Sequence, residues 1–242
     1  MNIGDRSLSQ QEAAALIDIS AVRTQHNYAD IVELVEYARR YRFINVHVLP
    51  NWVSVLSRLL KDIPGVYVGA PVGFPSGGHT TSTKLNEACQ LVQDGVEEMD
   101  IVMNIGRFRN KEYDYVKDEI EQILSMVRSA ERKILTKVIL EINVLSDDEM
   151  LRACDMVIDC GADFVKTGTG WVPGDANIER IRKIKKHCGD RIMVKAAGGI
   201  RTRDEFDELA AMGVERMGIN TASALEIVSS FKSYEKKEEK VI

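Results

Sequence analysis

Two lysines end short β-branched runs in which a buried strand would normally carry only apolar residues. Lys166 ends the run 162–166, and Lys195 ends the run 192–195. An unpaired ammonium inside a protein carries a severe desolvation cost, so its charge must be compensated. Neighbouring parallel strands lie about 4.8 Å apart, so on adjacent strands each lysine would depress the pKa of the other. The resulting neutral amine is the group that forms a Schiff base with a carbonyl compound.

The alternative is that both lysines are paired, partly solvated residues at the mouth of the fold. Two carboxylates bear on this choice, because Asp100 lies in the fourth such run and Asp18 closes the first. Either carboxylate could relay protons beside the amines or only neutralise a lysine. His47 lies inside the second run, where a hydrogen-bonded core histidine is more common than a base. Lys137 and Glu141 are further polar residues of the fifth run.

Small residues follow three of the runs and are candidates for binding a phosphate. Backbone N–H groups of glycine-rich loops and of helix N-termini bind phosphate readily, although a bare Gly-Gly pair also occurs in simple tight turns. The candidates are Gly198 and Gly199 after the seventh run, Gly218 with Asn220 and Thr221 at the start of the last helix, and Thr167 to Gly170 after Lys166.

The β-branched runs alternate with amphipathic stretches, a pattern typical of β-α units around a parallel sheet. Eight runs occur, at 15–18, 43–49, 66–70, 99–103, 134–141, 162–166, 192–195 and 214–218. Helical periodicity is clearest at 31–41, 112–128, 147–159 and 204–212. Eight such units in a chain of 242 residues predict a single (β/α)8 TIM barrel rather than an open doubly wound sheet, and no GxGxxG motif follows an early strand. Polar residues at the C-terminal ends of barrel strands are then candidates for catalysis.

Composition limits the function classes further. Apolar residues make up 45% of the chain, charged residues 29%, and the formal net charge is −5, which does not favour nucleic acid as a partner. We expect no membrane span, no secretory signal, a cytoplasmic location and four reduced, buried cysteines. No linker divides the chain, so we expect one domain over 1–231 and a charged tail over 232–242. A homo-oligomer is left open, because no interface patch is evident.

The chain resembles the deoxyribose-phosphate aldolase family over roughly residues 12–230. This family comprises Schiff-base aldolases that reversibly join acetaldehyde to glyceraldehyde 3-phosphate. The resemblance is carried by four ordered blocks, which are 72–75 (VGFP) with Thr80 and Thr81, 98–106 (EMDIVMNIG), 161–167 (GADFVKT) and 194–202 (VKAAGGIRT).

The resemblance implies a role for each candidate residue. Lys166 would form the imine and Lys195 would hold down its pKa, while Asp100, with Asp18 and an ordered water, would relay protons. The electrons of the cleaved carbon–carbon bond pass into the iminium, so neither a metal nor a cofactor is expected. The phosphate of a small phosphorylated aldehyde or sugar would be held by Gly170, Gly198, Gly199, Gly218 and the Asn220–Thr221 turn.

The sequence also departs from the family pattern around the expected pocket. The departures are Gly168 where a serine is usual, Asn220 with Thr221 where two small hydroxyl residues are common, Asp18-Ile19-Ser20 where Asp-His-Thr is usual, and Trp171 where lysine or phenylalanine occurs. Three hypotheses therefore follow. The protein is an aldolase that cleaves 2-deoxy-D-ribose 5-phosphate, a related Schiff-base lyase or transaldol-type enzyme with another phosphorylated substrate, or a non-catalytic barrel that binds sugar phosphates.

Overall fold

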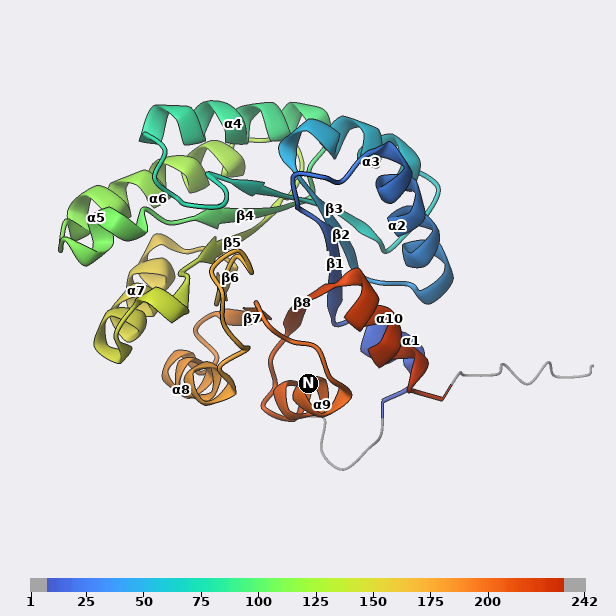
Figure 1. Cartoon of the computed structure of the whole chain (residues 1–242). Coiled ribbons are helices and arrows are strands. Elements are labelled where there is room, and N and C mark those ends of the chain that lie inside the picture. The colour runs from blue at the N-terminus through green and yellow to red at the C-terminus, as the bar shows by residue number, and fades with distance from the viewer. Residues whose placement is uncertain (1–7, 233–242) are drawn as a thin grey trace, which may run out of the picture.

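The computed structural model describes residues 8–232 and shows a closed barrel of eight parallel strands, as the sequence predicts (Figure 1). Each strand pairs with the next along the chain, and β8 pairs with β1 to close the barrel. The strands are β1 Ile17–Ala21, β2 Asn45–Val48, β3 Tyr67–Val72, β4 Glu98–Val102, β5 Leu135–Ile139, β6 Phe164–Lys166, β7 Met193–Ala197 and β8 Arg216–Asn220.

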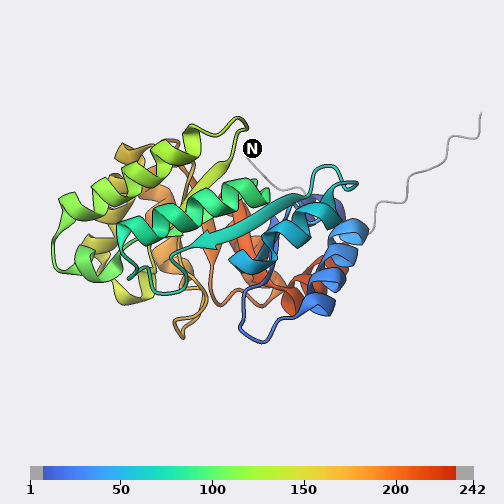
Figure 2. The same cartoon turned by 90° about the horizontal axis from the view of Figure 1, so that it is seen from above.

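Helices surround the strands on the outside, as the two perpendicular views show (Figures 1 and 2). The α-helices are α1 Gln10–Ala14, α2 Tyr28–Tyr41, α3 Val53–Leu60, α4 Thr81–Asp94, α5 Ile105–Arg109, α6 Tyr113–Arg128, α7 Asp147–Cys160, α8 Ile178–Cys188, α9 Arg203–Ala211 and α10 Thr221–Ser229. Two 3-10 turns, η1 Pro50–Trp52 and η2 Ile142–Val144, follow β2 and β5.

Local sequence signals determine where several helices begin and end. In α7 the Ser146 side chain accepts from the Glu149 N–H while the Glu149 carboxylate accepts from the Ser146 N–H, which forms a capping box. The same box is formed by Thr202 and Glu205 at the start of α9. Helix α7 ends at Gly161, whose φ of 76° is the left-handed conformation that glycine adopts without strain.

The strand register separates an apolar outer face from a charged interior. Ile101, Val138, Val165 and Val194 are successive register partners on β4 to β7, and all are fully buried. Side chains of successive residues point to opposite faces of a sheet, so the residue after Val165 or Val194 points into the barrel. The predicted pairing of the two lysines is confirmed, because Lys166 and Lys195 are register partners on β6 and β7.

Three residues lie at other strand positions than expected, and two of them are charged. Asp18 is the second residue of β1 rather than its end, because pairing with β2 continues to Ala21 opposite Val48. Lys195 is the third residue of β7 and not its last. Gly218 likewise lies inside β8 and not in the loop after it. The polar residues that end an apolar run here do not end the strand, so these charges lie inside the barrel, below its mouth.

The remaining sequence expectations concern the surface and the tail. Cys154, Cys160 and Cys188 are buried, but Cys89 is exposed on α4, which corrects the expectation for that residue. Within residues 8–232, no helix is long and apolar enough to cross a membrane. The expected charged tail lies outside the described residues except for Lys232, whose carbonyl accepts from the Gln10 N–H at 3.3 Å.

Candidate active site

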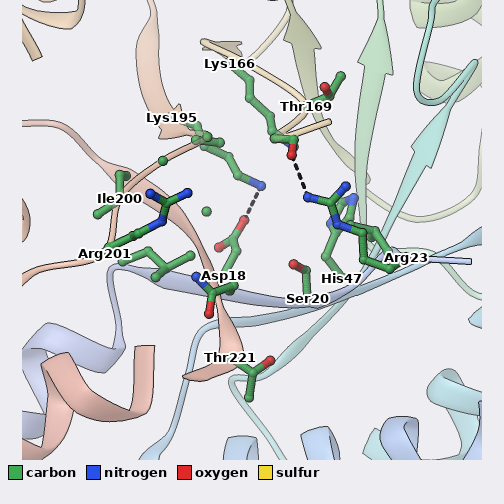
Figure 3. Close-up of a pocket in the computed structure, with 18 of the residues that line it drawn as sticks. Asp18, Ser20, Arg23, His47, Lys166, Thr169, Lys195, Ile200, Arg201 and Thr221 are labelled. Atoms are coloured by element: carbon green, nitrogen blue, oxygen red, sulfur yellow. Dashed lines mark hydrogen bonds and ion pairs between the residues drawn. The ribbon is translucent and has the colours of Figure 1, made fainter. Parts of the chain in front are cut away.

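A cavity of about 390 Å³ opens at the C-terminal ends of β1, β6, β7 and β8 (Figure 3). Nine of the eleven predicted site residues line this cavity. They are Asp18, Lys166, Gly170, Lys195, Gly198, Gly199, Gly218, Asn220 and Thr221. Asp100 lies directly beneath Lys166 with no solvent exposure, and Thr167 lies behind the wall. The candidate catalytic and phosphate-binding residues therefore face the same space, as expected for the mouth of a barrel.

The two lysines share one carboxylate of β4. Asp100 Oδ2 lies 2.8 Å from Lys166 Nζ and 2.8 Å from Lys195 Nζ. Lys166 is only 7% exposed, and that exposed part faces the cavity. A ligand in the cavity can thus reach the Lys166 amine while the carboxylate remains in contact with both amines.

A wider ion network supports this triad, and it includes Glu98 and Arg216, which were not among the predicted site residues. Arg216 contacts Asp18 Oδ1 and Glu98 Oε1, each at 2.5 Å. Lys137 Nζ lies 2.6 Å from Glu98 Oε2 and 3.1 Å from Asp100 Oδ1. Glu98 opens the block 98–106 that carries the resemblance, and Arg216 lies in the run 214–218 with no motif around it. The strand period would have placed both side chains in the interior.

The pKa of the Lys166 ammonium is lowered to about 8, chiefly by burial. The Asp100 carboxylate opposes this effect, and the positive charge of Lys195 adds to it. The sequence analysis predicted a lowered pKa and attributed it to Lys195, so the direction is supported but the main cause is different. Desolvation penalises the charged amine more than its neighbouring cation does.

Three other groups of the network remain charged near neutral pH, namely Lys195, Asp18 and Asp100. For Lys195, burial acts to lower the pKa, but Asp100 and Asp18 outweigh it and raise the pKa above its usual value. For Asp18 and Asp100, burial acts to raise the pKa, but the surrounding cations outweigh it and hold both pKa values low. Lys166 is therefore the member of this set whose proton leaves near neutral pH.

His47 lies on the cavity wall beside the network. Its Nε2 is 3.7 Å from Asp100 Oδ2, which is beyond hydrogen-bond range, and neither ring nitrogen has a hydrogen-bond partner among residues 8–232. Burial holds the pKa of His47 well below its usual 6.5, so the ring is neutral. The expectation of a hydrogen-bonded core histidine is wrong in its hydrogen bonding, although the residue is buried.

Backbone geometry prepares the opposite side of the cavity for an anion. Gly198 and Gly199 have φ of 94° and 89°, which favour glycine, and a Cβ at Gly199 would lie 2.5 Å from the Ala176 backbone nitrogen. Asn220 caps α10, where its Oδ1 accepts from the Ser223 N–H at 3.0 Å. The N-terminus of α10 therefore faces the cavity with backbone N–H groups, which is a favourable arrangement for a phosphate.

Two residues of the loop after β6 are structural. The Thr167 hydroxyl donates to the Ala197 carbonyl at 3.0 Å and accepts from the Ala197 N–H at 2.9 Å, so it ties β6 to β7. At Gly168, a Cβ would lie 2.9 Å from a carboxylate oxygen of Glu141, which bonds to Thr169. The position of Glu141 thus accounts for glycine where the family pattern has serine.

Several residues that line the cavity were not among the predicted site residues. Arg201 comes two residues after Gly199, so its place in the loop was available as a signal. Ser20 comes two residues after Asp18 and points to the same face, as the strand period requires. Phe74 belongs to the block 72–75 (VGFP) that carries the resemblance, so its signal was available. Arg23 carried no signal, because only the tertiary structure brings the loop after β1 to this cavity. Within the described chain, no three His, Cys, Asp or Glu side chains are arranged to hold a metal ion.

Comparisons with known proteins agree with this geometry. A family model described as DeoC/LacD family aldolase matches residues 7–225. The chain is similar to the deoxyribose-phosphate aldolase of Sinorhizobium medicae (strain WSM419), with 43% identity over 222 residues that cover 92% of this chain and 88% of the relative.

Solved structures give the same result. One described as QR15, an aldolase, is 32% identical with a TM-score of 0.82 and covers 90% of this chain and 96% of its own. A deoxyribose phosphate aldolase from Aeropyrum pernix, described as having a unique tetrameric structure, is 27% identical with a TM-score of 0.84 and covers 93% of each chain. By sequence and by structure, the chain belongs to the DeoC/LacD family of aldolases.

Proposed function

We propose that the protein is a deoxyribose-phosphate aldolase, a lyase that cleaves 2-deoxy-D-ribose 5-phosphate to D-glyceraldehyde 3-phosphate and acetaldehyde. The observation that carries this proposal is the buried amine of Lys166, with a pKa of about 8, at the base of a cavity with glycine-rich loops. The relatives described as deoxyribose-phosphate aldolases favour this activity over the other two hypotheses that the sequence raises.

The first step is attack of the Lys166 amine on the aldehyde carbon of the open-chain sugar. For a pKa of about 8, roughly a quarter of the Lys166 amines are neutral at pH 7.5, whereas an ordinary lysine is almost wholly charged. The carbonyl oxygen takes up two protons, one lost by the attacking nitrogen and one from the surrounding groups, and leaves as water, while the nitrogen lone pair forms the iminium bond. Asp100, 2.8 Å from Lys166 Nζ, is the residue placed to pass these protons on, with Asp18 and an ordered water.

The iminium then accepts the electrons of the broken carbon–carbon bond. The hydroxyl of the sugar's third carbon loses its proton, the bond between the second and third carbons breaks, and D-glyceraldehyde 3-phosphate leaves. The enamine that remains takes up a proton at its terminal carbon, water adds to the iminium, and acetaldehyde leaves with the amine restored. The charged Lys195 ammonium stabilises the ionised carboxylate of Asp100 throughout these steps.

The phosphate would lie against the loops that follow β7 and β8. Gly198, Gly199 and the N-terminus of α10 provide backbone N–H groups at that end of the cavity. A phosphate bound there would lie away from Lys166, and the carbonyl end of the sugar would then face the amine.

The test is reductive trapping of the imine. Wild-type protein incubated with 2-deoxy-D-ribose 5-phosphate and borohydride should gain the mass of one ethyl group, and peptide mapping should place that gain on Lys166. The Lys166→Leu variant should lose both the adduct and the cleavage activity, whereas Lys186→Met, at an exposed residue of α8, should keep both. An active wild type whose Lys166 stays unmodified would refute the proposal.

Two further expectations remain predictions that accompany this function. A homo-oligomer is one of them, and the tetramer described for the Aeropyrum pernix relative supports testing it by light scattering. A cytoplasmic location is the other, and it can be checked by cell fractionation.

A further inference from the structure

An exposed arginine at the mouth of the cavity is held in a defined position by a tryptophan. Arg23 follows β1, and its Nη2 donates to the Gly170 carbonyl at 2.7 Å. The Arg23 guanidinium carbon lies 5.0 Å from the centre of the Trp171 ring, within the range of a cation–π contact. Trp171 in turn donates through Nε1 to the Val22 carbonyl at 3.3 Å. The loop after β1 and the loop after β6 are therefore joined at two points.

The tryptophan itself is fixed from two other directions. Its backbone N–H donates to Thr169 Oγ1 at 3.0 Å. The Phe74 ring, from the loop after β3, meets the Trp171 ring edge-on with centres 5.8 Å apart. Arg23 thus rests on a rigid aromatic surface, so less side-chain entropy is lost when it binds a ligand than for an unsupported arginine.

The position of Arg23 places it beside the loops expected to hold the phosphate. Gly170, whose carbonyl Arg23 contacts, packs on Gly198, since a Cβ at Gly170 would lie 3.8 Å from Gly198 Cα. Arg23 and Arg201 line the same cavity from opposite sides, as Figure 3 shows. A phosphate against Gly198 would therefore lie beside the Gly170 backbone to which Arg23 is hydrogen-bonded.

Arg23 has unused hydrogen-bond donors. A guanidinium group carries five N–H donors, and only Nη2 has a partner among residues 8–232. Its Nε and Nη1 form no hydrogen bond with the described chain, although the side chain stands beside a carbonyl and an aromatic ring that fix its orientation. Arginine binds phosphate oxygens through two parallel, charge-assisted hydrogen bonds, and such donors fit that use.

We propose that Arg23 is a specificity-determining residue that binds the substrate's phosphate together with the loops after β7 and β8, and that Trp171 positions it. This inference rests on the proposed function, because it identifies which group of the substrate Arg23 contacts. Because position 171 is a tryptophan, the loop after β6 has no cationic side chain there to bind a phosphate. Arg23 supplies one from the loop after β1 instead, and the tryptophan ring holds it there.

The test compares a phosphorylated and an unphosphorylated substrate. In Arg23→Gln, the KM for 2-deoxy-D-ribose 5-phosphate should rise roughly 10- to 100-fold, because a charged hydrogen bond is lost. Its kcat for the phosphorylated substrate should stay within about threefold of the wild-type value. Its kcat/KM for unphosphorylated 2-deoxy-D-ribose should equal that of the wild type. Arg40→Gln is the matched control, because Arg40 is also an exposed arginine on an aromatic ring, 5.2 Å from the centre of Tyr41, and lies outside the cavity.

A rescue variant separates a role in charge from a role in loop structure. Trp171→Lys in the Arg23→Gln background places an ammonium at the side of the cavity from which the guanidinium was removed. Its KM for the phosphorylated substrate should lie between those of Arg23→Gln and the wild type. If Arg23→Gln instead lowers kcat/KM for both substrates equally, or changes neither, the proposed phosphate contact is wrong.

Binding of inorganic phosphate distinguishes failure of this inference from failure of the proposed function. If the wild type cleaves neither sugar, the proposed function fails, and calorimetric titration with inorganic phosphate then tests Arg23 alone. Weaker phosphate binding in Arg23→Gln than in wild type and Arg40→Gln would support the contact. Binding that is equal in all three proteins, or absent from all three, would overturn it.

Discussion

Replacing Lys166 by methionine should abolish activity and stabilise the folded protein at neutral pH. Burial lowers the pKa of Lys166 from its usual 10.5 to about 8, so the folded state holds this proton less tightly than the unfolded chain. Below pH 8 the folded protein therefore carries a charged amine in an unfavourable environment. At 1.36 kcal/mol per pKa unit, the gap between 10.5 and about 8 corresponds to about 3 kcal/mol of lost stability.

The sign of the pH dependence follows from the same values. Between pH 8 and 10.5 the unfolded chain binds the Lys166 proton and the folded state does not, so wild-type stability rises with pH relative to the variant. Methionine has a similar length and no charge, and Asp100 keeps its contacts with Lys137 and Lys195. The advantage of Lys166→Met should thus be about 3 kcal/mol below pH 8 and should disappear near pH 10.5.

Urea unfolding at a series of pH values measures this difference. Wild type, Lys166→Met and the control Lys186→Met should be compared at each pH, because titration of all other groups then cancels. A Lys166→Met protein that is less stable than wild type at pH 7, or whose advantage is the same at pH 7 and pH 10.5, would show that Lys166 is not held in a destabilised charged state.

Three further substitutions test the surrounding groups. Asp100→Asn removes the carboxylate that opposes the effect of burial, so the pKa of Lys166 should fall below about 8. The acid limb of the imine-trapping profile, where the rate rises with pH as Lys166 loses its proton, should then move to lower pH. An acid limb at the same pH as in the wild type would contradict this. His47→Leu should leave that limb in place, because burial already keeps the imidazole neutral, as a pH series of trapping rates would show. Glu119→Gln removes the carboxylate 2.6 Å from the buried Lys84 ammonium, which then keeps only its hydrogen bond to the neutral Val102 carbonyl at 2.8 Å. Chemical unfolding should show a loss of about 3 kcal/mol, while the activity per folded molecule is unchanged.

The fold was predictable from the sequence because the signals that determine it are local. The alternation of β-branched runs with amphipathic stretches depends only on neighbouring residues, and it gave the correct number of strands and their order. The strand ends were less predictable. Asp18 and Ser20 interrupt the apolar pattern of β1, yet backbone pairing with β2 continues past both, since hydrogen bonding does not depend on side-chain polarity.

The candidate site was predictable where a residue is unusual for its position. A lysine in a buried strand is such a residue, and Lys166 and Lys195 both lie where that reasoning places them. Arg23 and Trp171 were not predictable as a pair, because they are far apart in sequence and meet only through the packing of two loops. The cause of the lowered pKa of Lys166 also required the structure, since burial depends on the closure of the whole barrel.

The arrangement of charges in the barrel interior explains why one particular amine is reactive. The network holds four cationic side chains and three carboxylates, and each of three cations contacts two carboxylates, whereas Lys166 contacts only one. The three doubly paired cations are Lys137, Lys195 and Arg216. Loss of the Lys166 proton leaves three cations with three carboxylates, so the neutral amine balances the buried charge. Lys166, the cation with the fewest partners, faces the cavity and is more exposed there than Lys195, at 7% against 1%, so the barrel directs its uncharged amine toward the substrate.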